Sequence, residues 1–173
     1  MALCLAALAA RGPALAAPAP DPRGVRLEAV SWRLLPRTAG RGAAWTEVRS
    51  ADVAGSKLPG RIRAVATLVN GGSPAVLGLV LRYVVSLRYA LPGGGFEDVP
   101  FYLDERHIPS IKTGETSRLS LAVPNVGSNL RDSAGPDMPA PVSIHLRAVL
   151  KPRADLADKL QSVAADLNLR YSK

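Results

Sequence analysis

The sequence predicts an all-β protein built as an immunoglobulin-like antiparallel β-sandwich of about seven or eight strands. Three observations lead to this fold class. Apolar and polar residues alternate with a period of two over several long stretches. Segments rich in Gly, Pro and Asn separate these stretches. Strands do not alternate with helical segments in the pattern that a parallel sheet would require.

The clearest strand covers residues 75–91, where the odd positions form an apolar stripe. We expect this stripe to be buried: Leu77, Leu79, Leu81, Tyr83, Val85, Leu87, Tyr89 and Leu91. A helix would scatter these positions around its circumference, so the segment is one long strand or two strand segments joined by a bend.

Residues 61–70 alternate as well, with their apolar side chains on even positions. Asn70-Gly71-Gly72-Ser73-Pro74 then supplies turn residues before the next strand. We therefore expect a hairpin in which opposite residues have numbers that sum to about 145, so that both apolar stripes share one face.

Shorter stretches predict the remaining strands, at residues 25–35, 96–103, 117–123 and 142–150. Turns are expected at residues 36–44, 92–95 and 124–141. Residues 154–171 fit two patterns, because Leu156, Leu160, Val163 and Leu167 suit a helix while Val163, Ala165, Leu167, Leu169 and Tyr171 alternate as a strand. We expect a short helical turn followed by a strand.

The first 17 residues have the features of a secretory signal peptide. An apolar run over residues 2–10 precedes Ala14-Leu15-Ala16, where small residues stand at the spacing that a signal peptidase requires. The first basic residue, Arg11, follows this run instead of preceding it, which an upstream start codon would explain. The alternative is a cytosolic protein with an Ala-rich terminus. We expect residues 18–173 to form one domain, periplasmic or secreted, without a transmembrane segment.

Composition narrows the kinds of site. The single cysteine, Cys4, lies in the predicted leader, so a disulfide, a thiolate zinc site and a cysteine nucleophile are not expected. A formal charge of +8 permits anionic partners. The basic residues are scattered, with few aromatic residues between them, so a nucleic-acid partner is not expected.

Two turn motifs carry a family resemblance. They are Ala66-Thr67-Leu68-Val69-Asn70-Gly71-Gly72-Ser73 and Ile108-Pro109-Ser110-Ile111-Lys112-Thr113-Gly114-Glu115. Over residues 61–123 the pattern resembles exported bacterial immunoglobulin-like domains of the CARDB and WHy (late-embryogenesis-abundant type 2) kinds. Those families similarly end a strand in Asn near Gly or Pro, and place a P-x-x-x-x-G-E turn before a penultimate strand. The resemblance implies the sandwich fold and a non-catalytic adhesion, binding or protective role, and it carries over no functional residue.

Few residues suggest catalysis or metal binding. Asp104-Glu105-Arg106-His107 is a dense ionisable cluster, for which we expect a solvated loop, because adjacent residues of an extended chain point to opposite sides. His145 is expected to face solvent. Trp32 and Trp45 are expected in core or rim packing, with stacking on a sugar as the less common alternative. No cofactor or metal site is expected.

The expected hairpin register points to four arginines as partner-binding residues. It places Arg63 opposite Arg82 on the outer face, where directly opposed like charges cost stability, and Arg61 and Arg88 extend the same face. Val65, Val80 and Val84 would form an apolar patch among them. The alternative is that the arginines reach into water or pair with Glu28, Glu47 or Asp52.

These residues leave two functions open. The favoured one is a non-catalytic binding or structural module of the cell envelope that docks a protein, an anionic polymer or a second copy of itself. The other is an envelope hydrolase with a dispersed carboxylate site, for which Asp104 and Glu105 are the clustered candidates. Two carboxylates about 5 to 9 Å apart in a cleft would favour the hydrolase, whereas exposed arginines on a flat face would favour the binding module.

Overall fold

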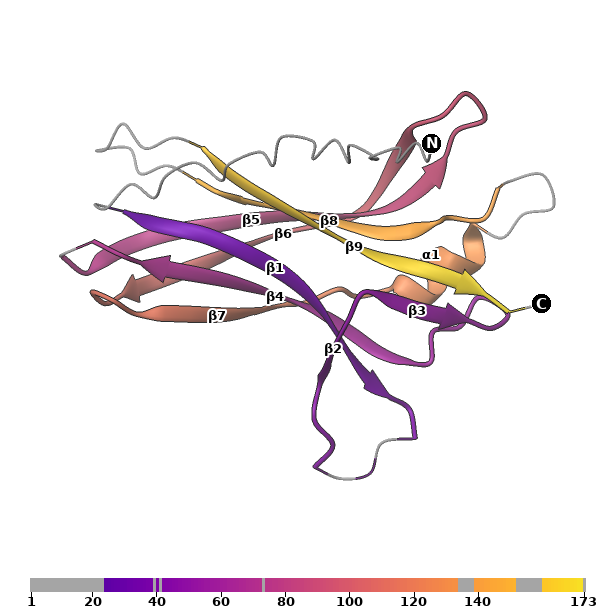
Figure 1. Ribbon diagram of the computed structural model, residues 1–173, viewed down its shortest axis with the longest axis horizontal. Helices are drawn as coiled ribbons and strands as arrows, with labels where there is room; N and C mark the ends of the chain where they lie inside the picture. Colours follow the sequence, from indigo (N-terminus) through magenta and orange to yellow (C-terminus); the bar gives the residue numbers. More distant parts are fainter. Residues whose placement is uncertain are drawn as a thin grey trace, which may run out of the picture.

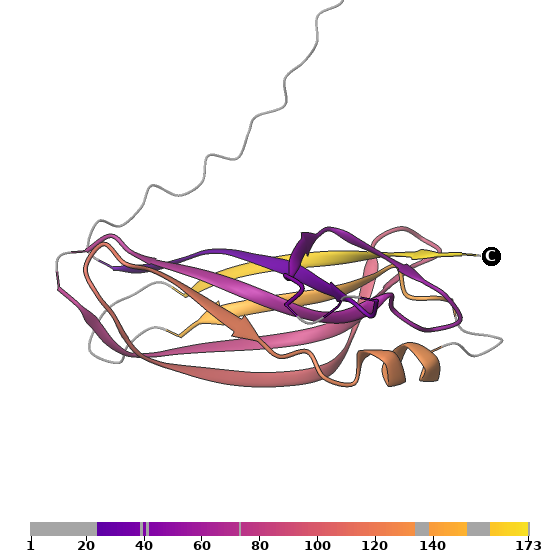
Figure 2. The same cartoon turned by 90° about the horizontal axis from the view of Figure 1, so that it is seen from below.

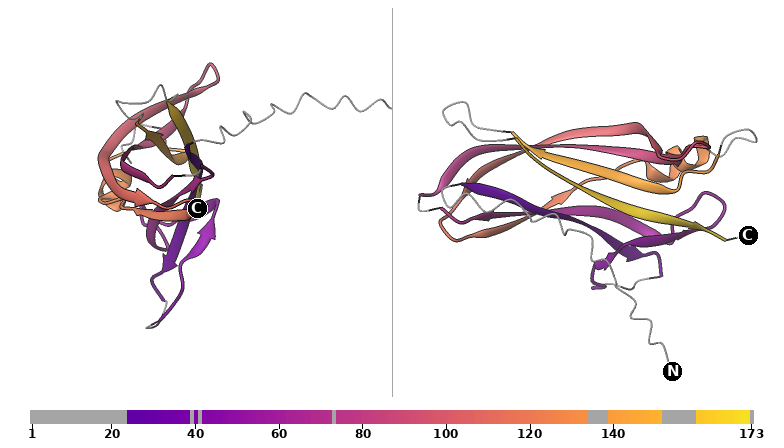
Figure 3. Two further views of the ribbon diagram at one scale, coloured as in Figure 1. Left: turned by 90° about the vertical axis from the view of Figure 1, so that its left-hand side faces the viewer. Right: turned by 45° about the horizontal axis from the view of Figure 1, so that its top comes forward.

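The protein folds as a sandwich of two β-sheets with one short helix. The computed structural model describes residues 24–38, 40, 42–72, 74–133, 139–151 and 160–172. Seen along the long axis of the molecule, the strands enclose one interior (Figure 3, left). The predicted all-β sandwich is confirmed, and the described residues form nine strands instead of seven or eight.

The two sheets differ in size. The smaller sheet has the order β2-β1-β4-β7, with β1 at Val25–Pro36, β2 at Thr46–Val48, β4 at Gly60–Asn70 and β7 at Thr116–Leu121. The larger sheet has the order β3-β9-β8-β5-β6, with β3 at Ser50–Val53, β5 at Val76–Ala90, β6 at Phe96–Ile111, β8 at Ser143–Leu150 and β9 at Gln161–Tyr171 (Figure 1). The pairing is antiparallel except between β3 and β9, which run parallel.

The predicted alternation correctly identifies most of the core. Ala64, Ala66 and Leu68 of β4 are fully buried, as are Leu81 and Tyr83 of β5. Both apolar stripes therefore line the interior between the sheets, where removal from water stabilises the fold.

The predicted hairpin between residues 61–70 and 75–91 is wrong. Strand β4 pairs with β1 and β7, whereas β5 pairs with β6 and β8 in the other sheet. After Asn70 the chain crosses from one sheet to the other. Alternation shows only that each strand has one buried face. Two strands can bury these faces against each other from opposite sheets as well as side by side in one sheet, so the pattern does not indicate which strands pair.

Asn70 holds this crossover in place. Its fully buried side chain donates hydrogen bonds to the carbonyl oxygens of Pro74 (3.1 Å) and Ile111 (3.0 Å) and accepts one from the amide of Gly72 (2.9 Å). Its backbone bonds to the second turn motif, through Gly114 and Glu115. The two motifs that carry the family resemblance thus contact each other and connect the sheets.

The apolar stripe of β5 fails at its two ends. Leu77 is 65% exposed and Leu91 43% exposed, although both were expected in the core. Gly78 has a φ of +67°, which glycine adopts without steric cost, and the bend there leaves Val76 and Leu79 buried while Leu77 faces solvent. Leu91 lies beyond β5, at the turn before β6.

Other expectations are partly correct. The turn at residues 92–95 joins β5 to β6, as predicted, with positive φ at Gly94 and Gly95. Strand β6 continues to Ile111, so Asp104-Glu105-Arg106-His107 lies in a strand and not in a loop. The segment 124–141, expected as a turn, contains the helix α1 at Val126–Asp132.

Residues 161–171 form strand β9, as expected, while the predicted helical turn over residues 154–159 and the predicted signal peptide lie outside the described residues. Within the described ranges, no helix is both long and apolar enough to cross a membrane.

Candidate binding groove

The structure separates the four candidate arginines into two pairs. Arg61 and Arg63 lie on β4, at odd positions whose side chains point away from the core of the smaller sheet. Arg82 and Arg88 lie on the outer face of β5 in the larger sheet. The outer faces of the two sheets are on opposite sides of the sandwich, so the predicted single arginine face is wrong. The error follows directly from the hairpin register.

Arg82 is neutralised by a carboxylate on the neighbouring strand. Its Nε donates a hydrogen bond to Glu105 Oε1 at 2.6 Å, and Lys151 Nζ lies 2.7 Å from the same oxygen. The hydrogen bonds from Lys151 and Arg82 lower the pKa of Glu105 below its ordinary value. Arg82 therefore has a partner within the fold.

Arg88 lies in a larger charge network across four strands. It forms two hydrogen bonds to Asp98, the shorter at 2.7 Å, and two to Asp166, the shorter at 3.0 Å. The hydrogen bond with Asp98 raises the pKa of Arg88 and lowers that of Asp98. His145 Nδ1 lies 3.0 Å from Asp166 Oδ1, and the side chain of His145 is only 12% exposed. His145 is thus on the outer face, as expected, but largely covered.

The two clustered carboxylates have different neighbours on the adjacent strand β5. Asp104 lies opposite the buried Tyr83, whose hydroxyl donates a hydrogen bond to it at 3.1 Å. Glu105 lies opposite Arg82 on the outer face. Burial raises the pKa of Asp104, but hydrogen bonds from the Glu105 amide and the Tyr83 hydroxyl outweigh it, so the net pKa is lowered. The two carboxylates therefore belong to opposite faces of β6.

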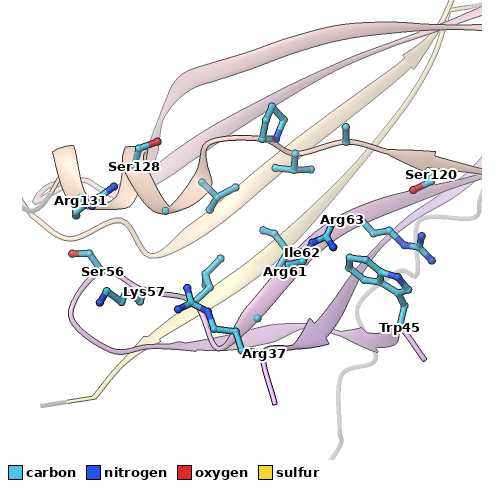
Figure 4. Close-up of a pocket in the computed structure, with 17 residues that line it drawn as sticks. Arg37, Trp45, Ser56, Lys57, Arg61, Ile62, Arg63, Ser120, Ser128 and Arg131 are labelled. Carbon is cyan, nitrogen blue, oxygen red and sulfur yellow. The ribbon is translucent and has the colours of Figure 1, made fainter. Parts of the chain in front are cut away.

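A groove of about 700 Å³ lies on the other side of the molecule, beside Arg61 and Arg63. Figure 4 shows Arg131, Ser56 and Lys57 toward one end, and Arg63 with Trp45 toward the other. Among the described residues that line it, five are cationic and none is Asp or Glu; the five are Arg37, Lys57, Arg61, Arg63 and Arg131. Apolar and hydroxyl side chains fill the spaces between them: Leu58, Ile62, Val123, Val126, Ser56, Ser120 and Ser128. We call this the basic groove.

The basic groove exists because β7 leaves the smaller sheet early. Strand β7 pairs with β4 only between Ala64 and Val69, ending at Leu121. The chain then turns into α1, which Figure 2 shows beyond the end of β7. Val126 and Leu130 are buried and fix the helix against the core. The remaining part of β4, from Gly60 to Arg63, is left as one wall of the groove.

Arg63 has an aromatic neighbour in place of a carboxylate. Its guanidinium lies 4.2 Å from the ring centroid of Trp45, at cation–π distance. Its Nε is buried without a hydrogen-bond partner. Across the described ranges, none of the five groove cations has a carboxylate within ion-pair distance. Their positive charges therefore remain uncompensated by the part of the protein that the structure describes.

Comparison with known proteins identifies no family for this chain. No family model matches the chain. No curated protein matches it either. Among solved structures, the chain is similar to a crystal structure of the C-terminal domain of Wzt, at 10% sequence identity and a TM-score of 0.40, covering 87% of this chain and 76% of that one. The resemblance to CARDB and WHy domains stays a prediction from the sequence motifs.

Sequence reasoning identified two of the five groove cations, Arg61 and Arg63. It missed the other three, because Arg37 and Arg131 fall in segments expected to be turns and Lys57 falls between expected strands. Of the two tryptophans, Trp32 is buried in the core and donates a hydrogen bond to the carbonyl oxygen of Ala165. Trp45 lines the groove.

Proposed function

We propose that this protein is a non-catalytic binding module that holds an anionic partner in the basic groove. The observation that carries the proposal is the gathering of five cations in one groove, where the described residues include neither an acidic lining residue nor an ion-pair partner for any of the five. The leader-like residues 1–17 support a place for this module in the cell envelope, either periplasmic or secreted.

The charge pattern supports association through this groove in preference to the opposite face. Arg82 and Arg88 already have carboxylate partners, so an incoming anion would compete with Glu105, Asp98 and Asp166. The groove cations have no such competitor among the described residues. Because clustered like charges raise the local potential, they attract anions and speed their association. Such binding weakens as salt screens the charges.

Binding assays on the mature chain test this proposal. Fluorescently labelled polyphosphate and poly-L-glutamate serve as anionic probes, measured by anisotropy at low and at high salt. Two variants have the same net charge: Arg61→Ala with Arg131→Ala in the groove, and Arg147→Ala with Arg170→Ala on β8 and β9. We expect the groove variant to bind at least one probe about tenfold more weakly, while the control variant stays near wild type.

Two results would overturn the proposal. If both variants lose affinity equally, only net charge matters and the groove is not a site. If neither variant loses affinity, the probes bind elsewhere. Circular dichroism of both variants establishes that the sandwich remains folded in each case.

A further inference from the structure

We propose that the occupant of the basic groove is an extended acidic peptide that pairs as an added strand with the free edge of β4. This inference rests on the proposed function and names the class of partner. Strand addition would supply a second means of recognition besides charge. The edge of a strand forms hydrogen bonds with main-chain groups, and only a polypeptide offers such groups at the matching spacing.

The free edge lies between Gly60 and Arg63. On one side these residues pair with β1, from Arg33 to Pro36. On the other side, β7 pairs with β4 only from Ala64 onward. No strand within the described part of the chain pairs with residues 60–63 on that side. Main-chain donors and acceptors along such an edge can accept another strand.

An added strand would continue the line of β7. Antiparallel neighbours lie about 4.8 Å apart, and β7 occupies that position beside β4 as far as Leu121. The chain then moves away through Ala122, Val123 and Pro124, which line the opposite side of the groove. The volume between this segment and Gly60–Arg63 is therefore where the sheet would gain its next strand.

The side chains of the groove suit a peptide of mixed character. Arg61, Arg63 and Arg131 supply positive charge, while Ile62 and Val126 supply apolar contact in the same groove. In an extended peptide, successive side chains point to opposite faces. Alternating acidic and apolar residues would therefore present carboxylates to the arginines and apolar groups to the remaining wall.

Ligands that bind by stacking fit the groove less well. Single-stranded nucleic acids stack their bases on open aromatic faces. The aromatic ring that lines the groove is Trp45, and the guanidinium of Arg63 already lies over it. Strand addition does not require an open ring.

The test alters the ligand and leaves the protein unchanged. An alternating Glu-Val peptide with capped ends is compared with two N-methylated forms, one methylated on every Glu and one on every Val. In a strand, amides of successive residues point to opposite edges, so only one of the two forms has methyl groups facing β4. We expect that form to bind about tenfold more weakly, through loss of its main-chain hydrogen bonds, and the other to bind like the parent peptide.

Amide hydrogen exchange locates the contact. The parent peptide should slow exchange within residues 60–63, whereas polyphosphate, which has no peptide backbone, should not. Equal affinity of the two methylated forms, whether both are weakened or neither, would overturn strand addition, as would unchanged exchange in residues 60–63.

The two proposals fail in different ways. If polyphosphate binding depends on Arg61 and Arg131 but the methylated peptides do not differ, the groove binds anions without adding a strand. If neither polyphosphate nor the parent peptide depends on these arginines, the proposed function fails as well.

Discussion

Arg33 and Arg63 lie directly opposite each other on β1 and β4, as a like-charged cross-strand pair. Glu47 lies 3.7 Å from Arg33, while Arg63 has the ring of Trp45 as its neighbour. The Nε atoms of both arginines are buried without hydrogen-bond partners. Opposed like charges cost stability in a sheet. An anion bound at Arg63, as proposed, would reduce that cost, and this pair would then couple binding to the stability of the fold.

Replacing Arg63 tests this coupling. We expect Arg63→Met to leave the free energy of unfolding within about 1 kcal/mol of wild type or to raise it, because the lost cation–π contact is offset by relief of repulsion. Polyphosphate should raise the melting temperature of wild type more than that of the variant, since at equal concentration a ligand that binds more tightly stabilises the folded state more. Thermal denaturation with and without polyphosphate measures both effects. A variant destabilised by several kcal/mol would mean that Arg63 is chiefly structural.

Leu81 and Arg82 test the assignment of the two faces of β5. Leu81 is fully buried in the core, so Leu81→Ala should lower the free energy of unfolding by about 2 to 5 kcal/mol through the cavity it leaves. Arg82→Ala removes only an exposed ion pair with Glu105, so its effect should be far smaller than that of Leu81→Ala. Urea denaturation compares the two variants. Equal large losses would contradict the burial pattern of β5.

Alternation predicts which residues of a strand are buried, but not which strands pair. Leu81 and Ala66 could be assigned to the core from period alone, because each strand needs only one apolar face. The hairpin was inferred from the turn residues after Asn70. A turn of that composition also permits a crossing between sheets, and the hydrogen bond from Asn70 to Ile111, 41 residues away, stabilises the crossing instead. No local pattern contains that distant contact.

The basic groove could be predicted only in part for the same reason. Arg61 and Arg63 stand out because they alternate with the partly buried Ile62 and the buried Ala64 of β4. Arg131 reaches the groove through α1, whose position depends on where β7 separates from β4. Val126 and Leu130 of α1 pack in the core, and such packing cannot be derived from the order of the strands.

Asn70 should be essential to the crossover. Asn70→Ala removes three side-chain hydrogen bonds and leaves the buried Ile111 carbonyl without that donor. We expect a loss of about 2 to 4 kcal/mol in the free energy of unfolding. The exposed Asn168 of β9, substituted as Asn168→Ala, provides a control of the same chemistry. Similar small losses for both, measured by urea denaturation, would show that the crossover does not depend on this side chain.

The ion pair between Arg88 and Asp98 predicts a pH dependence of stability. The hydrogen bond from Arg88 holds the pKa of Asp98 below its ordinary value of 3.8. A carboxylate whose pKa is lowered by folding stabilises the protein above its unfolded pKa, and this contribution is lost as the pH falls through the folded value. Wild type should therefore melt above Asp98→Asn at neutral pH, and the difference should disappear in acid.

A variant with the same change of charge provides the comparison for Asp98. Asp132, on α1, has an exposed carboxylate with no ion pair among the residues described. If Asp132→Asn reproduces the pH profile of Asp98→Asn in thermal melts, the effect comes from net charge and not from Arg88.

Gly60 should be required both for the closeness of β1 and β4 and for the shape of the groove. A Cβ at Gly60 would lie 2.1 Å from the carbonyl oxygen of Leu35, and backbone atoms cannot yield as a flexible side chain does. Gly60→Ala should therefore destabilise the fold by about 1 to 3 kcal/mol. It should also weaken poly-L-glutamate binding, because Gly60 begins the free edge of β4.

Gly71→Ala is the control, since a Cβ there meets no atom within 4 Å, and its stability should change by no more than about 0.5 kcal/mol. Urea denaturation and anisotropy, measured where both variants are folded, separate the two effects. If Gly60→Ala matches Gly71→Ala in both measurements, β1 does not approach β4 this closely and β4 does not form the wall of the groove described above.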